Sequence, residues 1–493
     1  MKNIAILGIC FLLWLTGCTP DHGNYDYTEL NEVSIDSIQE EYTVNRFSPL
    51  KIEPEFSLGE NADFRYLWYM YQNTSDKIDT LSHDRNLKKK ISSLPGTYIL
   101  VYKVFDTDME VYYNKRTEVT VKDVLSEGIL ILGMVNDSAE ISMVNTEGVV
   151  STQIHKGFTG RHLGIKPESI WHFIPSNPGN YTGREYVTVV YDGGKAALFD
   201  PLNFIKVMDE KKMFVVEPGI LKIEGYHPGY SGADYLVNNG KLHHRRYYLE
   251  YNIAVSGDYY LSTVPVGKYN PSSRVDLIAF YDEKGQRFVT MNAADGTAMT
   301  EMLVHKSPNP PFQPGNVGLD IKYVYNSGDG WCKGIFTDRD TRELYYLQFQ
   351  LMQTQGITKM KPQGKTAIPG TAKLHQAVSM LMSSVDDGNL IFAVGGEIWL
   401  YNLASGEETR VIDFNKEGKD FEIVKLMLHG EELIVALNDK NARAEGGSIR
   451  MLIVSTLGGS IVLSEKPVGA FDILADKVVD IAYKFMNLDY RLR

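Results

Sequence analysis

The residues with the clearest chemical assignment lie at the N-terminus, where an apolar run ends in a cysteine. Met1-Lys2-Asn3 is cationic, Ile4–Leu15 is apolar, and Leu15-Thr16-Gly17-Cys18 ends the run. The run has the length of a secretory signal and is shorter than the roughly 20 apolar residues of a spanning helix. Small residues let a peptidase reach the bond before Cys18, whose thiolate can take a diacylglycerol. The pattern predicts a lipoprotein signal over residues 1–17 and lipidation of Cys18, with an ordinary signal and a chance cysteine as the alternative.

No second group of residues has the spacing of a catalytic or metal site. Patterns such as His-Glu-x-x-His, Cys-x-x-Cys, a phosphate-binding loop and a dinucleotide glycine motif are missing from the sequence. Cys10 leaves with the signal and Cys18 is lipidated, so Cys332 is left without a partner for an internal disulfide. We expect Cys332 to be buried and structural. No catalytic residue, metal or cofactor is predicted, and the chain is expected not to be an enzyme.

Carboxylates scattered along the chain supply the alternative case for an enzyme. Propeller hydrolases and lyases gather acids from several blades around a central funnel, where a pair of them cleaves a glycosidic bond. Each acid that could lie there has an equally ordinary role as a turn residue, a strand-end cap or a solvated charge. No spacing selects a pair among them. The four candidates are Asp192, Asp234, Asp276 and Glu397.

Aromatic residues in glycine-rich loops are the candidates for ligand binding. Sugar and peptide sites combine aromatic platforms with nearby amides and carboxylates. An aromatic side chain beside glycines in a loop has less claim to the core than one on an alternating strand, although packing between elements is the alternative role. Ligand contacts are predicted, in this order, for Trp331, Tyr226, Tyr230 and Tyr181.

The composition is that of a folded, acidic and tyrosine-rich chain. Of its 493 residues 43% are hydrophobic and 23% are charged, and the formal net charge is −12. Such a charge lacks the basic footprint of a nucleic-acid-binding protein and is repelled by anionic lipid, so membrane attachment rests on Cys18. The 30 tyrosines suit strands and also surfaces that bind sugars or peptides.

Residues 30–123 are predicted to form a small immunoglobulin-like β-sandwich. Short alternating segments separated by turns are typical of that fold. Alternate residues of Phe64–Tyr69 share one face of a strand, which places Trp68 in the core. The predicted strands are Tyr42–Val44, Leu50–Ile52, Phe64–Tyr71, Lys88–Ile91, Thr97–Phe105 and Glu118–Val121.

Several motifs of the N-terminal part resemble a known family. The segment Pro95-Gly96-Thr97-Tyr98 begins a strand that ends in Asp106, which is similar to a late strand of the polycystic-kidney-disease (PKD) sandwich. Together with the Cys18 motif, Gly23-Asn24-Tyr25-Asp26-Tyr27 and Trp68, it looks like the PKD-like lipoprotein family of the Bacteroidota. The resemblance is close to about residue 123 and looser beyond. It implies a surface lipoprotein accessory to outer-membrane nutrient-uptake systems of the starch-utilisation type, and it supplies no catalytic residues.

A polar tether over residues 18–29 indicates on which face of the outer membrane the anchored protein lies. Asp21, Asp26 and Glu29 follow Cys18 closely, and acids in this place are typical of Bacteroidota lipoproteins that are sent to the cell exterior. We therefore expect the outer face of the outer membrane, with the periplasmic face as the alternative.

Residues 124–493 are predicted to form a β-propeller of about seven blades. Val187–Tyr191 turns through Asp192-Gly193-Gly194 into a second strand, and Ile391–Val394 turns through Gly395-Gly396 in the same way. Turns centred at residues 137, 193, 239, 284, 340, 395 and 443 recur at the interval of four-stranded blades. Lys477–Tyr483 is the predicted closing strand, which would pair the last blade with the first. The predicted fold class is therefore all-β, and two further sandwich domains are the alternative for this region.

Three classes of function follow from these features. The leading one is a non-catalytic, lipid-anchored surface protein that binds glycan or peptide, or docks to an outer-membrane uptake complex. The second is a propeller enzyme that cleaves a polysaccharide, and the third is an adhesive or structural scaffold that binds proteins. An open aromatic groove would favour the first, two facing acids the second, and a broad exposed apolar patch the third.

Overall fold

The structure, a computed structural model, describes residues 34–56, 63–72, 77–173, 186–227, 233–246, 250–270, 273, 275–291, 298–415, 419–457 and 460–485. The predicted signal and tether, with Cys18, and the ligand candidates Tyr181 and Tyr230 lie outside the described residues. The chain divides after Asp123 into two compact units. The described part is all-β apart from α2 (Ile154–Thr159) and two short 3-10 turns, Glu210–Met213 and Lys373–Gln376. None of its helices is long and apolar enough to cross a membrane.

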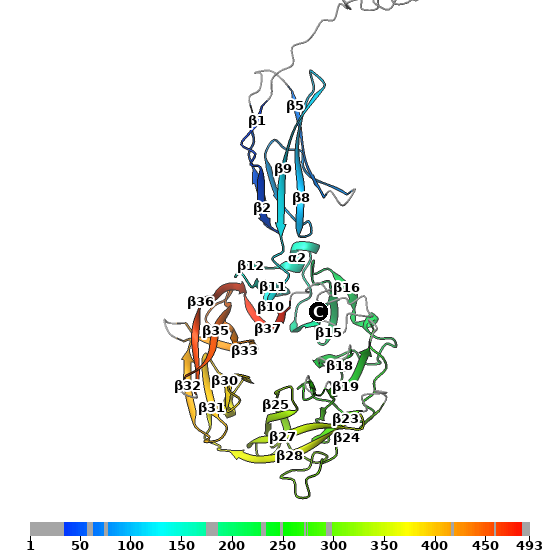
Figure 1. The fold of residues 1–493 in the computed structure, drawn as a ribbon, viewed down its shortest axis with the longest axis vertical. Coiled ribbons are helices and arrows are strands. Elements are labelled where there is room, and N and C mark those ends of the chain that lie inside the picture. Colours follow the sequence, from blue (N-terminus) through cyan, green and yellow to red (C-terminus); the bar gives the residue numbers. More distant parts are fainter. Residues whose placement is uncertain are drawn as a thin grey trace, which may run out of the picture. The chain divides into compact units, whose positions relative to one another are not determined.

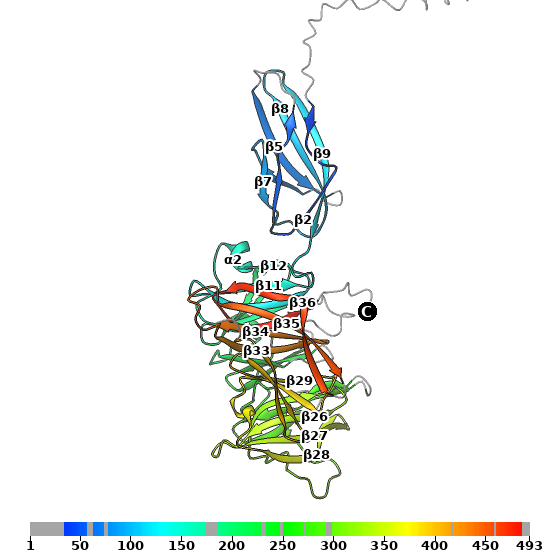
Figure 2. The ribbon, with the colours of Figure 1, turned by 90° about the vertical axis from the view of Figure 1, so that its left-hand side faces the viewer.

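The first unit is built on a five-stranded sheet with the strand order β2-β9-β8-β5-β6. β2 runs parallel to β9, and the other neighbours in this sheet are antiparallel. Figure 2 shows β5, β8 and β9 as its long strands, and two short ladders, β3 with β7 and β1 with β4, complete the unit. The strands are β1 (Ile35–Asp36), β2 (Glu41–Asn45), β3 (Pro49–Ile52), β4 (Glu55–Phe56), β5 (Phe64–Tyr71), β6 (Ile78–Ser82), β7 (Leu87–Lys90), β8 (Gly96–Asp106) and β9 (Val111–Lys122).

Trp68 lies in the core of the first unit, as predicted. Its side chain is fully buried, its indole N–H donates to the backbone oxygen of Asp84 at 3.1 Å, and its ring stacks on Tyr102 with centroids 4.1 Å apart. The structure differs from the prediction in that β1, β4 and β6 are additional and β9 begins at Val111 instead of Glu118. The exposed run 114–116 hides the alternation of β9, although its backbone pairs with β8 throughout.

The second unit is a succession of small antiparallel sheets. Its described residues form five sheets of four strands and two of three, together with the two-stranded ladder β20–β21. Figure 1 shows these sheets following one another around a ring, from β10 in cyan to β37 in red. The four-stranded sheets have the orders β12-β11-β10-β37, β13-β14-β15-β16, β25-β26-β27-β28, β29-β30-β31-β32 and β33-β34-β35-β36, and the three-stranded ones β17-β18-β19 and β22-β23-β24.

The bounds of these strands are as follows. The first half of the ring contains β10 (Gly128–Val135), β11 (Ser138–Asn145), β12 (Val150–Ser151), β13 (Pro167–Phe173), β14 (Tyr186–Tyr191), β15 (Lys195–Phe199), β16 (Lys206–Asp209), β17 (Ile223–His227), β18 (Ala233–Asn238), β19 (Lys241–Arg246), β20 (Lys268–Asn270), β21 (Val275–Leu277), β22 (Phe280–Asp282), β23 (Arg287–Met291) and β24 (Met299–Glu301). The second half contains β25 (Asp320–Asn326), β26 (Trp331–Thr337), β27 (Leu344–Thr354), β28 (Ile357–Ile368), β29 (Ser379–Met382), β30 (Asn389–Val394), β31 (Glu397–Asn402), β32 (Glu408–Asp413), β33 (Phe421–His429), β34 (Glu432–Asp439), β35 (Gly447–Leu457), β36 (Ser460–Ala475) and β37 (Lys477–Lys484).

Each of the seven predicted turns joins two paired antiparallel strands of the second unit. The turn chemistry explains why the sequence shows them. Tight hairpins need a positive φ at both central residues, which asparagine, aspartate and glycine tolerate best. Asn136 and Asp137 have φ of 49° and 58°, and Asn239 and Gly240 have 48° and 68°. The turn motifs therefore recur along the chain because each turn needs a backbone conformation that few residue types adopt.

The predicted closing strand is confirmed as β37. It pairs antiparallel with β10, so that the last strand of the chain completes the first sheet of the second unit. β37 also contacts β13 and β33, which belong to the sheets on either side. No edge of β10 is left open by this arrangement, and the sheet that closes the ring is built from both ends of the unit.

Candidate functional site

A cleft of about 390 Å³ lies where the sheet β33–β36 meets the sheet completed by β37. We call it the closure cleft. One wall comes from β33 to β36 and includes His429, Met451 and Phe471, and the other comes from β10, β11 and β37 and includes Asn145 and Tyr483. The volume lies within the range of sites for small ligands, which begins at roughly 300 Å³.

Stacked rings, one from each wall, form the aromatic part of the closure cleft. His429 and Tyr483 lie almost parallel, with centroids 3.5 Å apart and 10° between their planes. The ring of Phe485 packs 5.5 Å from His429. Burial lowers the pKa of His429 below its usual value, so its imidazole is neutral near pH 7. The Tyr483 hydroxyl donates to Glu127 at 3.3 Å, and burial raises its pKa. These rings therefore form an uncharged aromatic surface with a fixed orientation.

The polar groups of the closure cleft are an ion pair and an amide. Lys466 and Glu432 pair with each other, and their side chains are 31% and 30% exposed. They therefore offer donors and acceptors to a ligand without leaving a bare buried charge. Asn145 is nearly buried and uses its side-chain oxygen to accept from Glu147 N at 3.0 Å and Val149 N at 2.7 Å. Those bonds hold the loop after β11 in place.

Close backbone packing shapes the base of the closure cleft. A side chain at Gly128 would meet the Val144 backbone oxygen at 2.2 Å, and the φ of Gly128 is +147°. Glycine is therefore required where β10 enters the sheet. β10 and β11 can then lie close together, and residues 144–148 at the end of β11 line the cleft beside this contact.

Of the predicted ligand residues, Trp331 and Tyr226 lie among the described residues, and neither lines the closure cleft. Trp331 begins β26 and keeps 39% of its surface exposed. Its backbone is fixed by Asp329, which accepts from Trp331 N at 3.1 Å. Cys332 next to it is fully buried, which confirms the structural role expected for that thiol. Trp331 stays a candidate for contact with a ligand on an open surface.

Tyr226 on β17 packs against the neighbouring sheet β13–β16. Its ring stacks on Trp171 with centroids 5.9 Å apart, and its hydroxyl is buried. Burial, followed by the charge of Asp234, raises the pKa of that hydroxyl well above its usual value. Because the hydroxyl faces the protein interior, it is not presented to an external ligand. The prediction that Tyr226 lies in a loop was wrong, because β17 extends to His227, directly before Pro228-Gly229.

Three of the four acids proposed for a funnel have hydrogen-bond or ion-pair partners of their own. Asp234 is fully buried against Arg245, with Oδ1 2.7 Å from Nε. Asp192 accepts from the backbone nitrogens of residues 165 and 166 at 2.9 and 3.0 Å. Glu397 accepts from Arg410 and from the Trp399 indole, and Asp276 lies on β21. Among the described residues, then, each of the first three has its own partners, and none of these is another of the four.

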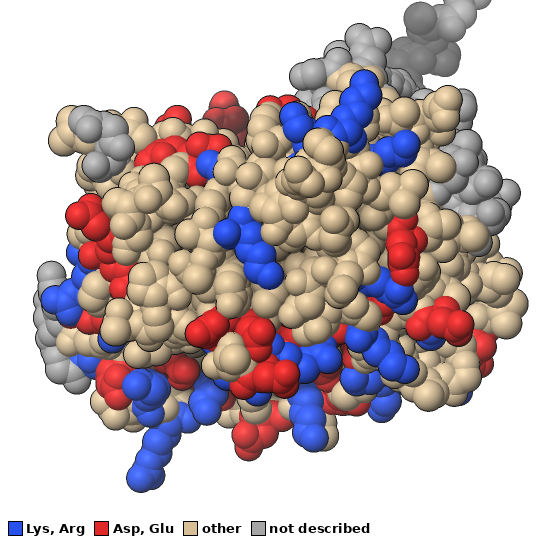
Figure 3. All heavy atoms as spheres, turned by 90° about the horizontal axis from the view of Figure 1, so that it is seen from below, with Lys and Arg blue, Asp and Glu red and all other residues tan. Residues whose placement is uncertain are grey.

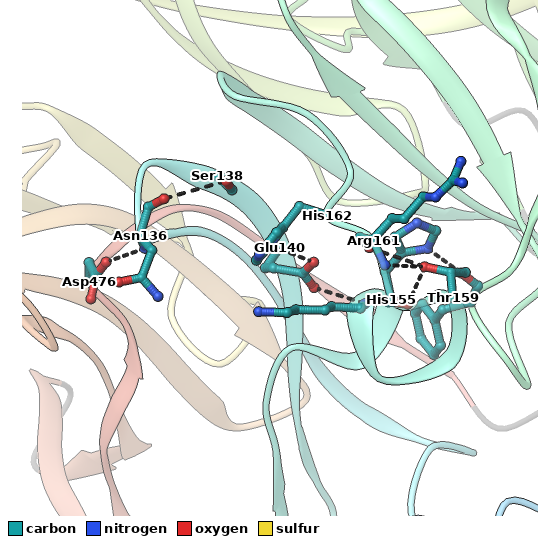
Figure 4. Close-up of polar contacts among 10 residues, drawn as sticks. Asn136, Ser138, Glu140, His155, Thr159, Arg161, His162 and Asp476 are labelled. Carbon is teal, nitrogen blue, oxygen red and sulfur yellow. Dashed lines mark hydrogen bonds and ion pairs between the residues drawn. The ribbon is translucent and has the colours of Figure 1, made fainter.

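A different carboxyl group, that of Glu140 on β11, is almost completely buried beside a histidine. Its side chain is 1% exposed, and its Oε1 lies 3.1 Å from Nδ1 of His162 (Figure 4). Burial raises the pKa of Glu140 to about 7, while burial and the nearby Lys156 lower the pKa of His162. A carboxyl that titrates near neutrality can hold or pass a proton. The hydroxyl of Thr159 on the adjoining helix donates to the His155 oxygen at 2.9 Å and is not aimed at this pair.

Glu140 should make the stability of the second unit depend on pH. Its pKa is raised above the unfolded value of 4.5, so its contribution is complete below that pH and is lost as the pH rises to about 7. At 1.36 kcal/mol for each pKa unit, the loss amounts to about 3 kcal/mol at most. The variant Glu140→Gln should lack this loss when urea midpoints are compared at about pH 5 and about pH 8.

The control for this prediction is the exposed acid of the nearby loop, Glu147→Gln. It removes the same charge from solvent and should keep the pH dependence of the parent chain. His162 contributes with the opposite sign, because its lowered pKa removes stability as the pH falls. Equal pH dependence in Glu140→Gln and in the parent chain would contradict the assignment.

Charge is mixed on the face of the second unit that is seen from below in Figure 1. Figure 3 shows lysine and arginine side chains interspersed with aspartate and glutamate, beside a broad uncharged area. Because the two signs alternate over short distances, this face presents no concentrated field to a polyanion.

The described residues define an all-β protein with an N-terminal unit built on a five-stranded sheet and a ring of sheets that carries a mixed aromatic and polar cleft. Residues 18–167 match the family model described as the PKD-like family. This confirms the PKD-like part of the sequence resemblance, and the match reaches past the first unit into β13. No curated protein matches the chain.

One solved structure shares the fold at a TM-score of 0.50, and two others match with lower scores. A quinonprotein alcohol dehydrogenase-like protein from Bacteroides thetaiotaomicron is 12% identical over 92% of this chain and 100% of that one, with a TM-score of 0.50. A protein from Lactobacillus plantarum is 12% identical over 72% of this chain and 99% of that one, with a TM-score of 0.42. The extracellular domain of a one component system from B. thetaiotaomicron is 10% identical over 85% of this chain and 56% of that one, with a TM-score of 0.32. At 12% identity the first of these bears on the fold alone.

Proposed function

We propose that this chain is a non-catalytic binding protein held on the outside of the outer membrane by a lipid on Cys18. In this proposal the first unit is a PKD-like sandwich and the second a seven-bladed β-propeller. The closure cleft takes a short saccharide or peptide segment delivered to, or captured for, an uptake complex. The observation that carries the proposal is the cleft itself, whose lining combines stacked rings with an ion pair and an amide.

The residues of the closure cleft favour binding over bond cleavage. An uncharged ring pair suits the flat face of a sugar or a planar side chain, and the Lys466–Glu432 pair can donate to and accept from neighbouring hydroxyls. Hydrolysis of a glycosidic bond needs two separate carboxyl groups on either side of the bond. Two carboxyl groups line the closure cleft, Glu147 and Glu432, and Glu432 is engaged by Lys466, so the lining supports recognition better than proton transfer.

The proposal is tested with the chain of residues 19–493 against a panel of oligosaccharides and peptides, by calorimetry and by product analysis. We expect a ligand that binds without being cleaved. Lys466→Gln should weaken it about tenfold or more, because a hydrogen bond to a charged group is worth about 1.5–3 kcal/mol. Thr146→Trp should block the opening of the closure cleft and abolish binding.

The matched control for Lys466→Gln is Lys206→Gln, which removes an exposed lysine on β16. It should leave affinity unchanged. Release of shortened oligosaccharide would overturn the non-catalytic assignment and favour the polysaccharide hydrolase or lyase. Equal binding by the parent chain, Lys466→Gln and Thr146→Trp would move the site away from the closure cleft, with Trp331 as the next position to test.

A protein-binding scaffold is the second candidate, and a separate observation favours it. Apolar side chains are exposed on β16 and on two loops joined by the bridge between Phe214 and Tyr251. Exposed apolar groups that gather in one region are typical of interaction surfaces. These side chains, with exposed fractions of 43% to 63%, are Ile205, Val207, Val215, Val216 and Ile253.

A further inference from the structure

The long sheet of the first unit has one face in the core and one face toward solvent. Core residues of β5, β8 and β9 include Trp68, Tyr102 and Val119, all of them fully or almost fully buried. Successive side chains on a strand point to opposite faces. The residues next to these core positions therefore lie on the other face of β5, β8 and β9, the strands that run side by side in Figure 2.

The strand registers fix which side chains lie together on this outer face. Arg65 pairs with Phe105 and Tyr71 with Ile99, while Phe105 in turn pairs with Tyr112. Neighbouring rows are about 6.7 Å apart along the strands, and neighbouring strands are about 4.8 Å apart. The four rows are Arg65–Phe105–Tyr112, Leu67–Lys103–Asn114, Tyr69–Val101–Arg116 and Tyr71–Ile99–Glu118. We call this set the outer sheet face.

Aromatic rings cover two ends of the outer sheet face. Tyr69 and Tyr71 are stacked, with centroids 6.3 Å apart and 23° between their planes. At the other end Phe105 and Tyr112 lie 4.5 Å apart, and Tyr112 is 54% exposed. The rings on this face provide apolar surfaces against which the C–H faces of sugar rings can pack.

Positive charge lies on three successive rows of the outer sheet face. Three cations and one acid, Glu118, stand in the four rows, although the whole chain has a net charge of −12. The ammonium of Lys103 is held 3.6 Å from the centroid of the Tyr112 ring, which fixes it at the surface. Arg65 and Arg116 are exposed. In the described part of the chain none of the three cations is held by a carboxylate, so all three are available to an anion.

We propose that the outer sheet face binds an acidic polysaccharide made of uronic acids. A uronate ring leaves its apolar face free to pack on Tyr69 and Tyr71, and its carboxylate projects from the edge of the ring toward the cations. The planar guanidinium of Arg116 matches a carboxylate with two parallel hydrogen bonds. An extended chain fits a flat sheet face, and successive carboxylates would meet Arg116, Lys103 and Arg65 in turn. This surface lies on the first unit and is independent of the closure cleft.

The test is affinity electrophoresis of the chain of residues 19–493 in gels that contain polygalacturonate. We expect retardation that weakens as salt is added, and none in neutral dextran. The double variant Lys103→Gln/Arg116→Gln should reduce affinity at least about tenfold, and so should Tyr69→Ala/Tyr71→Ala. The closure-cleft variant Thr146→Trp should bind polygalacturonate as the parent chain does, which separates this proposal from the proposed function.

A charge-matched control distinguishes a built surface from general attraction. Lys88→Gln/Lys89→Gln removes two exposed lysines from β7 of the same unit and should leave retardation unchanged. An equal loss in this control would overturn the proposal, and so would the absence of retardation in polygalacturonate. Binding of poly-L-glutamate or dextran sulfate that is as strong and does not depend on Tyr69 and Tyr71 would also overturn it, in favour of an acidic protein or a sulfated chain. Far-ultraviolet circular dichroism of each variant checks that the sheet is intact.

Discussion

Replacing Asp234 by asparagine is expected to destabilise the second unit by about 3–5 kcal/mol, the range found when one partner of a buried ion pair is removed. Asp234 lies directly opposite Arg245 in the pairing of β18 with β19, and both side chains are almost completely buried. The Tyr251 hydroxyl donates to the second oxygen of Asp234 at 2.8 Å. The guanidinium also lies 4.5 Å from the centroid of the Tyr251 ring.

The large effect arises because Arg245 cannot lose its charge when Asp234 is neutralised. Burial alone would lower the pKa of Arg245, but the carboxylate beside it raises the pKa overall. Asparagine keeps the shape and an acceptor for Tyr251, and it removes the carboxylate charge that lies against the guanidinium of Arg245. Urea unfolding followed by tryptophan fluorescence measures the change, since Trp171 stacks on Tyr226 beside this cluster.

A double variant separates the charge effect from simple disruption of packing. Asp234→Leu/Arg245→Met replaces the ion pair by apolar groups of similar size and should recover most of the lost stability, because a buried ion pair is rarely better than good apolar packing. A loss below about 1 kcal/mol in Asp234→Asn would mean that water reaches Arg245 and would contradict its burial.

The parts of the fold that could be predicted are those that depend on local chemistry. Asn239-Gly240 forms a tight hairpin because both residues tolerate positive φ, whatever the rest of the chain does. Trp68 could be assigned to the core because apolar residues alternate around it on β5. Closure by β37 could be predicted since a ring of sheets needs a partner for the edge of β10.

The closure cleft could not be predicted, because its walls come from segments far apart in the sequence. Asn145 on β11 and Tyr483 on β37 meet only after the ring has closed. His429, Met451 and Phe471 lie on alternating strands, where an apolar or aromatic residue is read as core. Trp331, in contrast, was predicted to contact a ligand because it is an aromatic residue beside glycines. The structure places it at the beginning of β26. Local patterns identify elements, whereas a cleft between sheets depends on which elements become neighbours.

The second large effect is expected when β37 is deleted, because the second unit depends on the pairing of β37 with β10. The deleted chain ends after Asp476. We expect the second unit to lose its cooperative unfolding transition, a change on the order of the whole stability of a domain, about 5–15 kcal/mol. The deletion removes the pairing of β10 from Gly128 to Met134 and leaves an open apolar edge. It also removes Asp480, which accepts from Ile170 N at 2.9 Å and from Lys425 at 2.5 Å and thereby links the sheets on both sides.

A chain that ends at Phe485 keeps β37 and is the control for this deletion. The milder variant Asp480→Ala keeps the strand and removes only the link, and it should cost about 2–3 kcal/mol, because the buried Ile170 N–H loses its acceptor and Lys425 its partner. Differential scanning calorimetry with circular dichroism follows both units of the same chain. The deletion should abolish the transition of the second unit and leave that of the first unit, whose core around Trp68 shares no strand with β37. If the deleted chain instead unfolds like the control, β37 adds no more than an edge strand to a sheet that is already stable, and closure of the ring cannot be what holds the cleft in shape.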